Sequence, residues 1–472
     1  MTLRELMGNG APEVEVSGLA YSDASVTPGT LFFCVPGFTR DGHEFAPNAV
    51  ARGAAALVVQ RPLGLGVPEV VVDEVRAAMG PAAARFHGDP TAALRVVGVT
   101  GTNGKTTTAF LVRALLEAGG LPTGLLGTVT SVVAGREEPV ERTTPEGIDL
   151  QELFRRMADG GDAACVMEVS SHALHMHRVA GIHFAVRVFT NLTQDHLDYH
   201  GSMEEYYLAK RLLFTQDGGP SIVNVDDSYG ARLAAEIDSA TTFSLERDAN
   251  FRADDVRFDV NGSTFLCRTP DGDAEIRTRL PGLFNVQNAL GAIAAARALG
   301  VPLATIAAAL AEATRVPGRF EPVDEGQGFG VLVDYAHTPD SLENVLRAAR
   351  ELTRGRLHVV FGAGGDRDRA KRPLMGRAAA ELADRVIVTS DNPRSEDPGA
   401  IVDQVMEGAP GAERVVDRRA AIAQALDTAA DGDVVVIAGK GHEQGQEFAG
   451  GRKEPFDDRE VARQALRAAV RS

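Results

Sequence analysis

VVGVTGTNGKTTT, residues 96–108, joins an apolar β-rich run to a glycine-rich turn and then to a helix expected over residues 107–117. In such a strand–turn–helix unit, backbone N–H groups around Gly101 and Gly104 and the helix N-terminus converge on a phosphate group. Lys105 is expected to reach the β- and γ-phosphates, and the Thr106 hydroxyl to ligate Mg²⁺. Gly98 lies one residue too early for the standard pattern, so we interpret the stretch as a variant phosphate loop. The strand–turn–helix context disfavours the alternative, a glycine-rich turn with an incidental lysine.

Length and composition favour a globular protein of two to four domains, since 472 residues exceed one ordinary core. A net charge of −17 argues against a nucleic-acid-binding surface, although a local basic site could still bind an anionic small molecule. The three cysteines, Cys34, Cys165 and Cys267, have neither disulfide-framework nor zinc spacing and fit a reducing compartment. Neither a signal segment nor a bilayer-length apolar run is evident. We therefore expect a cytoplasmic protein without stable membrane association.

Alternating strand and helix signals predict an α/β chain of three domains. Residues 1–90 indicate a small N-terminal α/β domain. Residues 91–317 indicate a central P-loop-type domain with a mainly parallel sheet, and residues 318–472 a Rossmann-like domain. The glycines at 362 and 364 do not make a dinucleotide fingerprint, because Arg367 stands where a third glycine is needed, and this argues against NAD as the ligand.

Two further strands of the middle segment end on polar residues. Glu168 follows an apolar run and is placed either to hold Mg²⁺ or to form a strand-end salt bridge. Residues 190–201 form a His/Asp cluster without the spacing of a zinc protease. Because parallel strands end at one edge of a sheet, these two segments and the phosphate loop are expected to converge on one crevice.

Several polar residues have two interpretations. Thr143 and Thr144 belong to a second candidate site and can also cap a helix expected over residues 146–158, and the two roles are compatible. Asn288 either faces an adenine or caps its helix, and the spacing around Lys210 favours an exposed surface lysine. Residues 38–43 form a polar loop that could hold a ligand, although a solvated connector is favoured.

In the last segment, strand ends present both arginines and acids: both residue types occur at residues 366–369 and 391–394, and an acid occurs at residues 439–443. An arginine can bind a carboxylate through two N–H groups, and an acid can bind an amine. This pairing therefore predicts a ligand that carries both a carboxylate and an ammonium group.

Four motifs occur in the order found in the Mur ligases of peptidoglycan synthesis: residues 100–107, 168–172, 191–198 and 391–394. The chain resembles this family over essentially its whole length, and in particular the type that adds the third residue of the stem peptide. The resemblance implies that the three domains bind the UDP of the substrate, ATP and the incoming amino acid, in that order. It also implies ATP as co-substrate, two Mg²⁺ ions and a monomer that works on small molecules.

The resemblance carries roles onto individual residues. It implies that ATP meets Gly101, Thr102, Asn103, Gly104, Lys105, Thr106, Thr107, Asn288, Arg319 and Asp334. It implies that the UDP-MurNAc-dipeptide meets Thr143, Thr144, Ser170, Arg178 and Lys210. It places meso-diaminopimelate against Arg367, Asp391, Asn392, Pro393, Arg394, Gly439 and Glu443. The catalytic residues that it implies are Lys105, Glu168, His196 and Lys210. The metal ligands that it implies are Thr106, Glu168, His196 and a carbamylated Lys210. The resemblance thus overturns the interpretation of Lys210 as a surface lysine.

The implied reaction is ATP-dependent addition of meso-diaminopimelate to UDP-MurNAc-L-Ala-D-Glu, since Arg394 can pair with the far carboxylate that lysine lacks. The rival interpretations are the same ligase using L-lysine, a folylpolyglutamate-synthetase-like ligase, and a nucleotide-dependent switch without ligase activity. The sequence departs from the family pattern at Ser22-Asp23-Ala24, which leaves the uridine contacts open, and at Met176, where a glutamine is common.

Overall fold

A computed structural model describes residues 1–37, 40–140, 142–259 and 261–469 of the chain. These residues form two compact units. The first comprises residues 1–100, 119–188 and 209–221, and the second comprises residues 101–118, 189–208 and the chain from residue 222 onward. The polar loop considered as a ligand site includes Phe38 and Thr39, which lie outside the described residues.

The N-terminal part of the first unit is a parallel sheet of β1 (Gly18–Ala20), β2 (Thr30–Phe33), β3 (Ala56–Val59) and β4 (Glu69–Val71), in that order. Its helices are α1 (Leu3–Met7), α2 (Ala46–Ala51) and α3 (Val75–Phe86). Successive side chains of β2 point to opposite faces: Leu31 and Phe33 pack with α3, and Phe32 packs with α2. Both faces of this strand are therefore buried, as is usual in parallel sheets.

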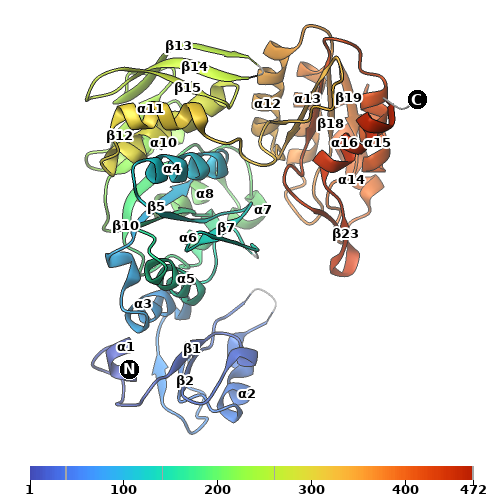
Figure 1. Cartoon of the computed structure of the whole chain (residues 1–472). Helices are drawn as coiled ribbons and strands as arrows, with labels where there is room; N and C mark the ends of the chain where they lie inside the picture. Colours follow the sequence, from blue (N-terminus) through green and yellow to red (C-terminus); the bar gives the residue numbers. More distant parts are fainter. Residues whose placement is uncertain (38–39, 141, 260, 470–472) are drawn as a thin grey trace. The chain divides into compact units, whose positions relative to one another are not determined.

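The other part of the first unit places β5 (Arg95–Thr100) between two strands (Figure 1). The order is β10-β5-β9-β6-β7-β8, with bounds Phe184–Phe189 for β10, Ala164–Glu168 for β9, Thr123–Leu126 for β6, Ser131–Val133 for β7 and Arg136–Glu138 for β8. β5, β9 and β6 are parallel. Helix α5 (Gly147–Asp159) packs against α3, and α6 (Ser171–His175) follows β9. The strands that carry the three predicted polar ends are thus sheet neighbours.

The second unit begins with α4 (Lys105–Ala118), the helix that follows the phosphate loop. The helices α10 (Leu283–Ala298) and α11 (Leu303–Glu312) pack against it (Figure 1). Alanines keep α10 narrow and allow burial of nearly its whole circumference. The remaining elements here are α7 (Leu197–His200), α8 (Met203–Arg211), α9 (Ser228–Glu236), β11 (Ser221–Asn224), β12 (Thr241–Ser244), β13 (Phe251–Asp259), β14 (Gly262–Arg268) and β15 (Ala274–Thr278). Strands β13–β15 form an antiparallel meander.

The C-terminal part of the second unit is a doubly wound sheet in the order β16-β17-β21-β18-β19-β20. The strands are β16 (Glu321–Pro322), β17 (Gly330–Asp334), β18 (Leu357–Phe361), β19 (Arg385–Val388), β20 (Glu413–Arg414) and β21 (Val434–Ala438), all parallel except β16. Helices α12 (Pro339–Leu352), α13 (Lys371–Leu382) and α14 (Pro398–Met406) cover one face, and α15 (Arg418–Asp427) and α16 (Asp458–Ala469) cover the other (Figure 1). A hairpin of β22 (Gly445–Phe448) and β23 (Arg452–Pro455) precedes α16. This is the Rossmann-like arrangement that the sequence predicts.

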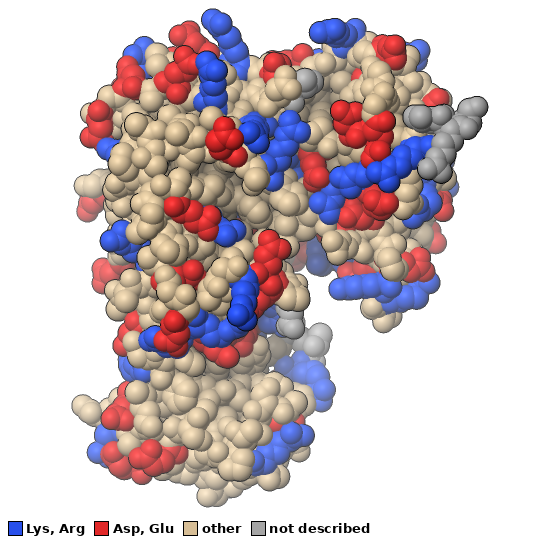
Figure 2. Space-filling model, viewed as in Figure 1, with Lys and Arg blue, Asp and Glu red and all other residues tan. Residues whose placement is uncertain are grey.

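The surface carries side chains of both charges. Acidic and basic side chains are interspersed on the face drawn in Figure 2, and the chain carries a net charge of −17. Within the described ranges, no helix is long and apolar enough to cross a bilayer.

Candidate active site

The phosphate loop, residues 100–107, turns at two glycines whose backbone no ordinary side chain tolerates. The φ angles of Gly101 and Gly104 are 149° and 85°. A Cβ atom at Gly101 would overlap Thr190 Oγ1, and one at Gly104 would overlap Asn288 Oδ1. Both positions therefore need glycine for conformation and for space.

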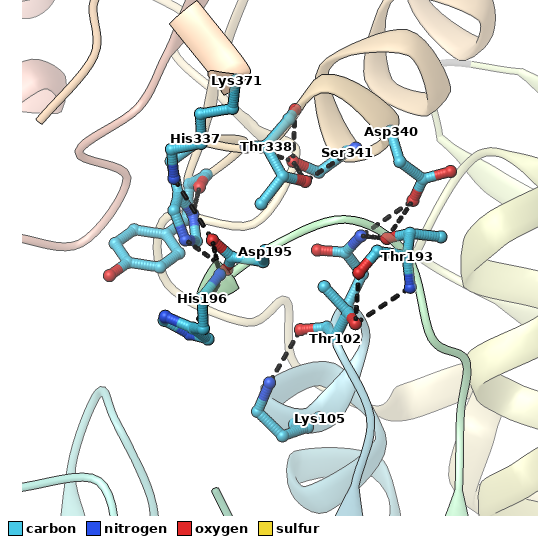
Figure 3. Close-up of polar contacts among 12 residues, drawn as sticks. Thr102, Lys105, Thr193, Asp195, His196, His337, Thr338, Asp340, Ser341 and Lys371 are labelled. Carbon is cyan, nitrogen blue, oxygen red and sulfur yellow. Dashed lines mark hydrogen bonds and ion pairs between the residues drawn. The ribbon is translucent and has the colours of Figure 1, made fainter. Parts of the chain in front are cut away.

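Lys105, the first residue of α4, folds back over this loop (Figure 3). Its Nζ donates to the carbonyl oxygens of Gly101 at 2.8 Å and Thr102 at 2.7 Å. The ammonium thus lies where the loop N–H groups and the helix N-terminus also concentrate positive charge. The arrangement suits an anion such as a triphosphate.

Residues that follow β10 hold the loop from one side. Thr102 N donates to Asn191 O at 2.9 Å, and Asn103 N donates to Asn191 Oδ1 at 2.9 Å. Thr190 Oγ1 donates to Asn103 O at 2.6 Å. These bonds fix the loop backbone without using Lys105.

The start of the C-terminal part reaches the same loop through Arg319. Its Nη2 donates to Thr106 Oγ1 at 2.9 Å, and its guanidinium lies 4.5 Å from the centre of the Tyr335 ring. Asp334 accepts bonds from Phe320 N at 2.6 Å and Ala336 N at 2.7 Å. Burial raises the pKa of Asp334, although the charge of Arg319 and these two bonds act in the opposite direction.

A cavity of about 80 Å³ lies at this junction. Its walls include six residues assigned to ATP from the sequence: Asn103, Gly104, Thr107, Asn288, Arg319 and Asp334. Phe284, Tyr335 and His337 also line it, and sequence reasoning did not assign them. Asn288 lies inside α10, whose N-cap is Gly282, so the capping alternative for Asn288 is wrong.

Asp340, near the start of α12, adds a second link to the loop (Figure 3). Its Oδ2 accepts a bond from Asn103 Nδ2 at 2.8 Å and from Thr193 Oγ1 at 3.4 Å. Burial raises the pKa of Asp340, and the two hydrogen bonds oppose that rise. The sequence did not single out this residue, because 237 positions separate it from Asn103.

Asp195 is the centre of a buried charge cluster in the same region (Figure 3). Lys371 Nζ lies 3.3 Å from its Oδ1, while Nε2 of His196 and of His337 lie 3.3 and 3.7 Å from its Oδ2. Burial disfavours the charged form, but the bond to His337 and the charge of Lys371 outweigh it and hold the pKa of Asp195 well below its usual range. His196, a predicted metal ligand, is therefore oriented by a carboxylate.

Four of the residues assigned to the dipeptide substrate, Thr143, Thr144, Ser170 and Arg178, lie near the end of β9 in the first unit. Thr144 Oγ1 donates to Glu168 O at 2.9 Å and accepts from Ser170 N at 3.1 Å. Arg178 Nη1 donates to Thr144 O at 3.2 Å, and its Nε lies 2.9 Å from Oε1 of the buried Glu146. The expected capping role is wrong: the N-cap of α5 is Glu146, and Thr144 bonds to the strand end instead.

Glu168 and Thr143 meet through Thr128. Thr128 N donates to Glu168 Oε1 at 2.8 Å and its hydroxyl to Oε2 at 3.1 Å, while the Thr143 hydroxyl lies 3.2 Å from that of Thr128. Lys210 is only 1% exposed, so the interpretation as a surface lysine, which its spacing favoured, is wrong. Burial of an amine is costly unless its charge is compensated or chemically removed.

Five of the residues assigned to the amino acid, together with Lys440, form a group that we call the C-terminal cluster: Asp391, Asn392, Arg394, Gly439, Lys440 and Glu443. Asn392 Nδ2 donates to Glu443 Oε2 at 2.8 Å. Arg394, whose φ is 51°, donates from Nη1 to Gly365 O at 2.7 Å and from Nε to Glu447 Oε2 at 3.2 Å.

The other assigned residues flank this cluster. Gly364 lies beside both arginines, since a Cβ there would be 3.1 Å from Arg394 Nη1 and 3.9 Å from Arg367 Cγ. Pro393 is buried next to Gly365. Sequence reasoning missed Lys440 and Glu447, although the Gly-Lys-Gly run at 439–441 after β21 was a usable signal.

Known proteins share both the domains and the full length of this chain. The Mur ligase middle domain matches residues 99–296, the Mur ligase glutamate ligase domain residues 318–441, and the catalytic domain of the Mur ligase family residues 15–87. A protein of Geobacillus thermodenitrificans is 49% identical over 469 residues, which cover 96% of this chain and 95% of that protein. The chain belongs to the Mur ligase family.

Two further Mur ligases illustrate the match. A Thermosynechococcus vestitus protein is 48% identical and covers 99% of this chain and 98% of its own length. A solved structure is 32% identical, with a TM-score of 0.71 and complete coverage of both chains. All three relatives carry the name UDP-N-acetylmuramoyl-L-alanyl-D-glutamate–2,6-diaminopimelate ligase.

The donor groups of this Mur ligase suit magnesium. Across the residues that the structure describes, no group of three or more His, Cys, Asp or Glu side chains forms a preassembled metal cage. Mg²⁺ typically binds one or two carboxylates together with substrate phosphates, and keeps several waters. The buried carboxylate of Glu168 in the first unit, and the Thr106 hydroxyl beside the phosphate loop in the second unit, are each an oxygen donor of the kind that Mg²⁺ prefers.

Proposed function

We propose that this chain is an ATP-dependent ligase that joins the amino group of meso-diaminopimelate to the D-glutamyl carboxylate of UDP-MurNAc-L-Ala-D-Glu, in peptidoglycan precursor synthesis. The observation that carries this proposal is the full-length identity of 48–49% to proteins of that name. It is supported by the phosphate loop and by the C-terminal cluster, where arginine and acid stand together as a zwitterionic acceptor requires.

The reaction has two steps. The D-glutamyl carboxylate attacks the γ-phosphorus of ATP, and the bond from this phosphorus to the β–γ bridging oxygen breaks. ADP departs, and the dipeptide now carries an acyl phosphate. The amine of diaminopimelate then attacks the acyl carbon, loses a proton, and inorganic phosphate departs. No covalent bond to the enzyme is needed, so positioning and electrostatic stabilisation account for the catalysis.

Each part of the chain has a role in these steps. Lys105 and the loop N–H groups hold the β- and γ-phosphates, and Arg319 contributes a second cation beside Thr106. Thr106, Glu168, His196 and a carbamylated Lys210 would hold two Mg²⁺ ions, which neutralise charge on the transferring phosphoryl group. Thr143, Thr144, Ser170, Arg178 and Lys210 bind the UDP-MurNAc-dipeptide.

We assign residues 1–90 to the UDP end of the substrate, residues 91–317 to ATP and residues 318–472 to the amino acid. A monomer in the cytoplasm is supported by two observations. The large apolar side chains exposed among the described residues are scattered, namely Met1, Val71, Leu208 and Leu283. All three cysteines are free and buried, which suits a reducing compartment.

Phosphate release with each substrate omitted in turn tests the proposal. Release is expected only when ATP, the UDP-linked dipeptide and diaminopimelate are all present. Lys105→Ala should reduce it by about 10²–10³-fold, because one preorganised charge on the transferred group is lost. Unchanged ADP formation without an amino acid would instead indicate a nucleotide-dependent switch.

A further inference from the structure

Lys440 is a completely buried lysine at the centre of the C-terminal cluster. Its Nζ lies 2.8 Å from Asn392 Oδ1, 3.0 Å from Glu443 Oε2 and 3.3 Å from Asp391 Oδ1. An ammonium group has three N–H donors. These three acceptors use all of them, so Lys440 has no donor left for a ligand.

The backbone around Lys440 directs this side chain inward. Gly439 and Gly441 on either side have φ angles of 118° and 53°. A Cβ at Gly439 would lie 2.9 Å from Asp391 Oδ2, and one at Gly441 would lie 2.6 Å from Gly318 O. Packing on both sides therefore fixes the turn that carries the lysine.

Lys440 also determines which way the Asn392 amide faces. Asn392 Oδ1 receives bonds from Lys440 Nζ and from Glu447 N at 3.0 Å, both of which can only donate. The amide nitrogen must then point the other way, and it donates to Glu443 Oε2. One buried cation thus orients an amide and a carboxylate that the proposed function places against the amino acid.

Lys440 also affects the net charge of the C-terminal cluster. Asp391 and Glu443 bring two negative charges, and Lys440 compensates one of them. Arg418 lies behind Asp391 and donates to Ala438 O, but it pairs with Asp458, so these two residues together add no net charge to the site. Glu447 is likewise paired with Arg394. Burial opposes ionisation of Asp391, yet the charges of Lys440 and Arg418 outweigh burial and lower its pKa.

We propose that Lys440 is a positioning and specificity-determining residue: it holds Asn392 and Glu443 in place and makes the site favour a zwitterionic acceptor over a cationic one. This inference rests on the proposed function. Diaminopimelate has no net charge at neutral pH, whereas lysine has one positive charge. Without the ammonium of Lys440 the site would carry one more uncompensated negative charge, which attracts the cationic acceptor.

The test is steady-state kinetics of the full chain with Lys440→Met and Lys440→Gln. Both variants should raise the KM for diaminopimelate by about tenfold or more, because hydrogen bonds to charged groups are lost. Their KM values for ATP and for the UDP-linked dipeptide should stay within about twofold of wild type. The ratio of kcat/KM for lysine to that for diaminopimelate should rise by about tenfold, an effect that loose packing alone would not produce.

Lys453→Met is the matched control, since Lys453 is an exposed lysine on β23. It should leave all three KM values unchanged. Lys440→Gln keeps an N–H donor and is the deciding variant if Lys440→Met fails to fold. A folded variant with an unchanged KM for diaminopimelate, or with both amino acids affected equally, would overturn the role of Lys440. A wild-type enzyme that does not use diaminopimelate would refute the proposed function instead.

Discussion

We propose a charged ligand for both the phosphate loop and the C-terminal cluster, but the two sites are built from different parts of the chain. The loop is contiguous, and backbone groups held by Gly101 and Gly104 shape it. The cluster depends on buried side chains from two strand ends, with Asn392 and Lys440 48 positions apart. Substitutions that add a side chain should therefore impair the loop most, and substitutions that remove a charge should impair the cluster most.

The largest effect should come from removing a charge in the cluster. Asp391→Ala leaves Lys440 with one acceptor fewer and removes one of the two carboxylates near Arg418, which keeps its pairing with Asp458. Loss of one partner of a buried ion pair costs about 3–5 kcal/mol. Chemical denaturation should show destabilisation of that size, and the KM for diaminopimelate should rise while the KM for ATP does not.

Asp403→Ala is the control for this change, because Asp403 pairs with Arg414 at the surface and is 62% exposed. Surface pairs contribute about 0–1 kcal/mol, so little destabilisation is expected. Equal destabilisation by the two variants would show that the buried charges of the cluster contribute no more to folding stability than a surface ion pair does.

Added bulk in the loop should give the next largest effect. In Gly104→Ala the new methyl group overlaps Asn288 Oδ1, and the backbone keeps a φ of 85°. The strain and the displaced amide together should lower kcat/KM for ATP by about 100-fold, which corresponds to roughly 3 kcal/mol. Diaminopimelate kinetics at saturating ATP should change far less.

Gly120→Ala separates strain from overlap. Gly120 has a φ of 81°, but nothing lies within 4 Å of a Cβ placed there. This variant should lose about 1–2 kcal/mol of stability and keep the wild-type kcat/KM for ATP. Weak ATP use in Gly120→Ala would mean that general destabilisation, rather than the shape of the loop, explains Gly104→Ala.

The same contrast explains how much could be predicted from sequence. Local patterns predicted the Rossmann-like sheet and the phosphate loop, because periodicity and glycines act over a few residues. Lys210 was misread from local spacing, since its burial comes from tertiary packing. Thr144 was misread as a cap because its partners, Glu168 O and Ser170 N, lie 24 and 26 positions away.

Asp195 and Asp340 show the same limit. Their partners Lys371 and Asn103 are distant in the chain, and no local pattern marks such pairs. The roles of the C-terminal residues came from the family resemblance, whereas the local argument gave only a carboxylate-and-amine ligand. Side-chain clusters that join distant strand ends are thus the part of the site that sequence reasoning predicts least well.

The smallest effect concerns a structural ion pair beside the cluster. Hydrogen bonds from Arg372 lower the pKa of Glu396 to about 2. This depressed value stabilises the fold above the unfolded pKa of about 4.3, and the stabilisation is lost as the pH falls from there toward 2. Glu396→Gln should therefore cost roughly 1 kcal/mol at pH 7 and pH 5, and less at pH 4, in urea unfolding. A constant difference down to pH 4 would contradict the depressed pKa.

The central claim is that the C-terminal cluster selects the amino acid for a carboxyl group activated at the phosphate loop. The most direct test measures kcat/KM for meso-diaminopimelate and for L-lysine in the wild type and in Arg394→Ala. We expect a preference for diaminopimelate of about 100-fold or more in the wild type, and a loss of at least tenfold of that preference in the variant. Equal use of both amino acids by the wild type, or an equal fall for both in Arg394→Ala, would contradict the account.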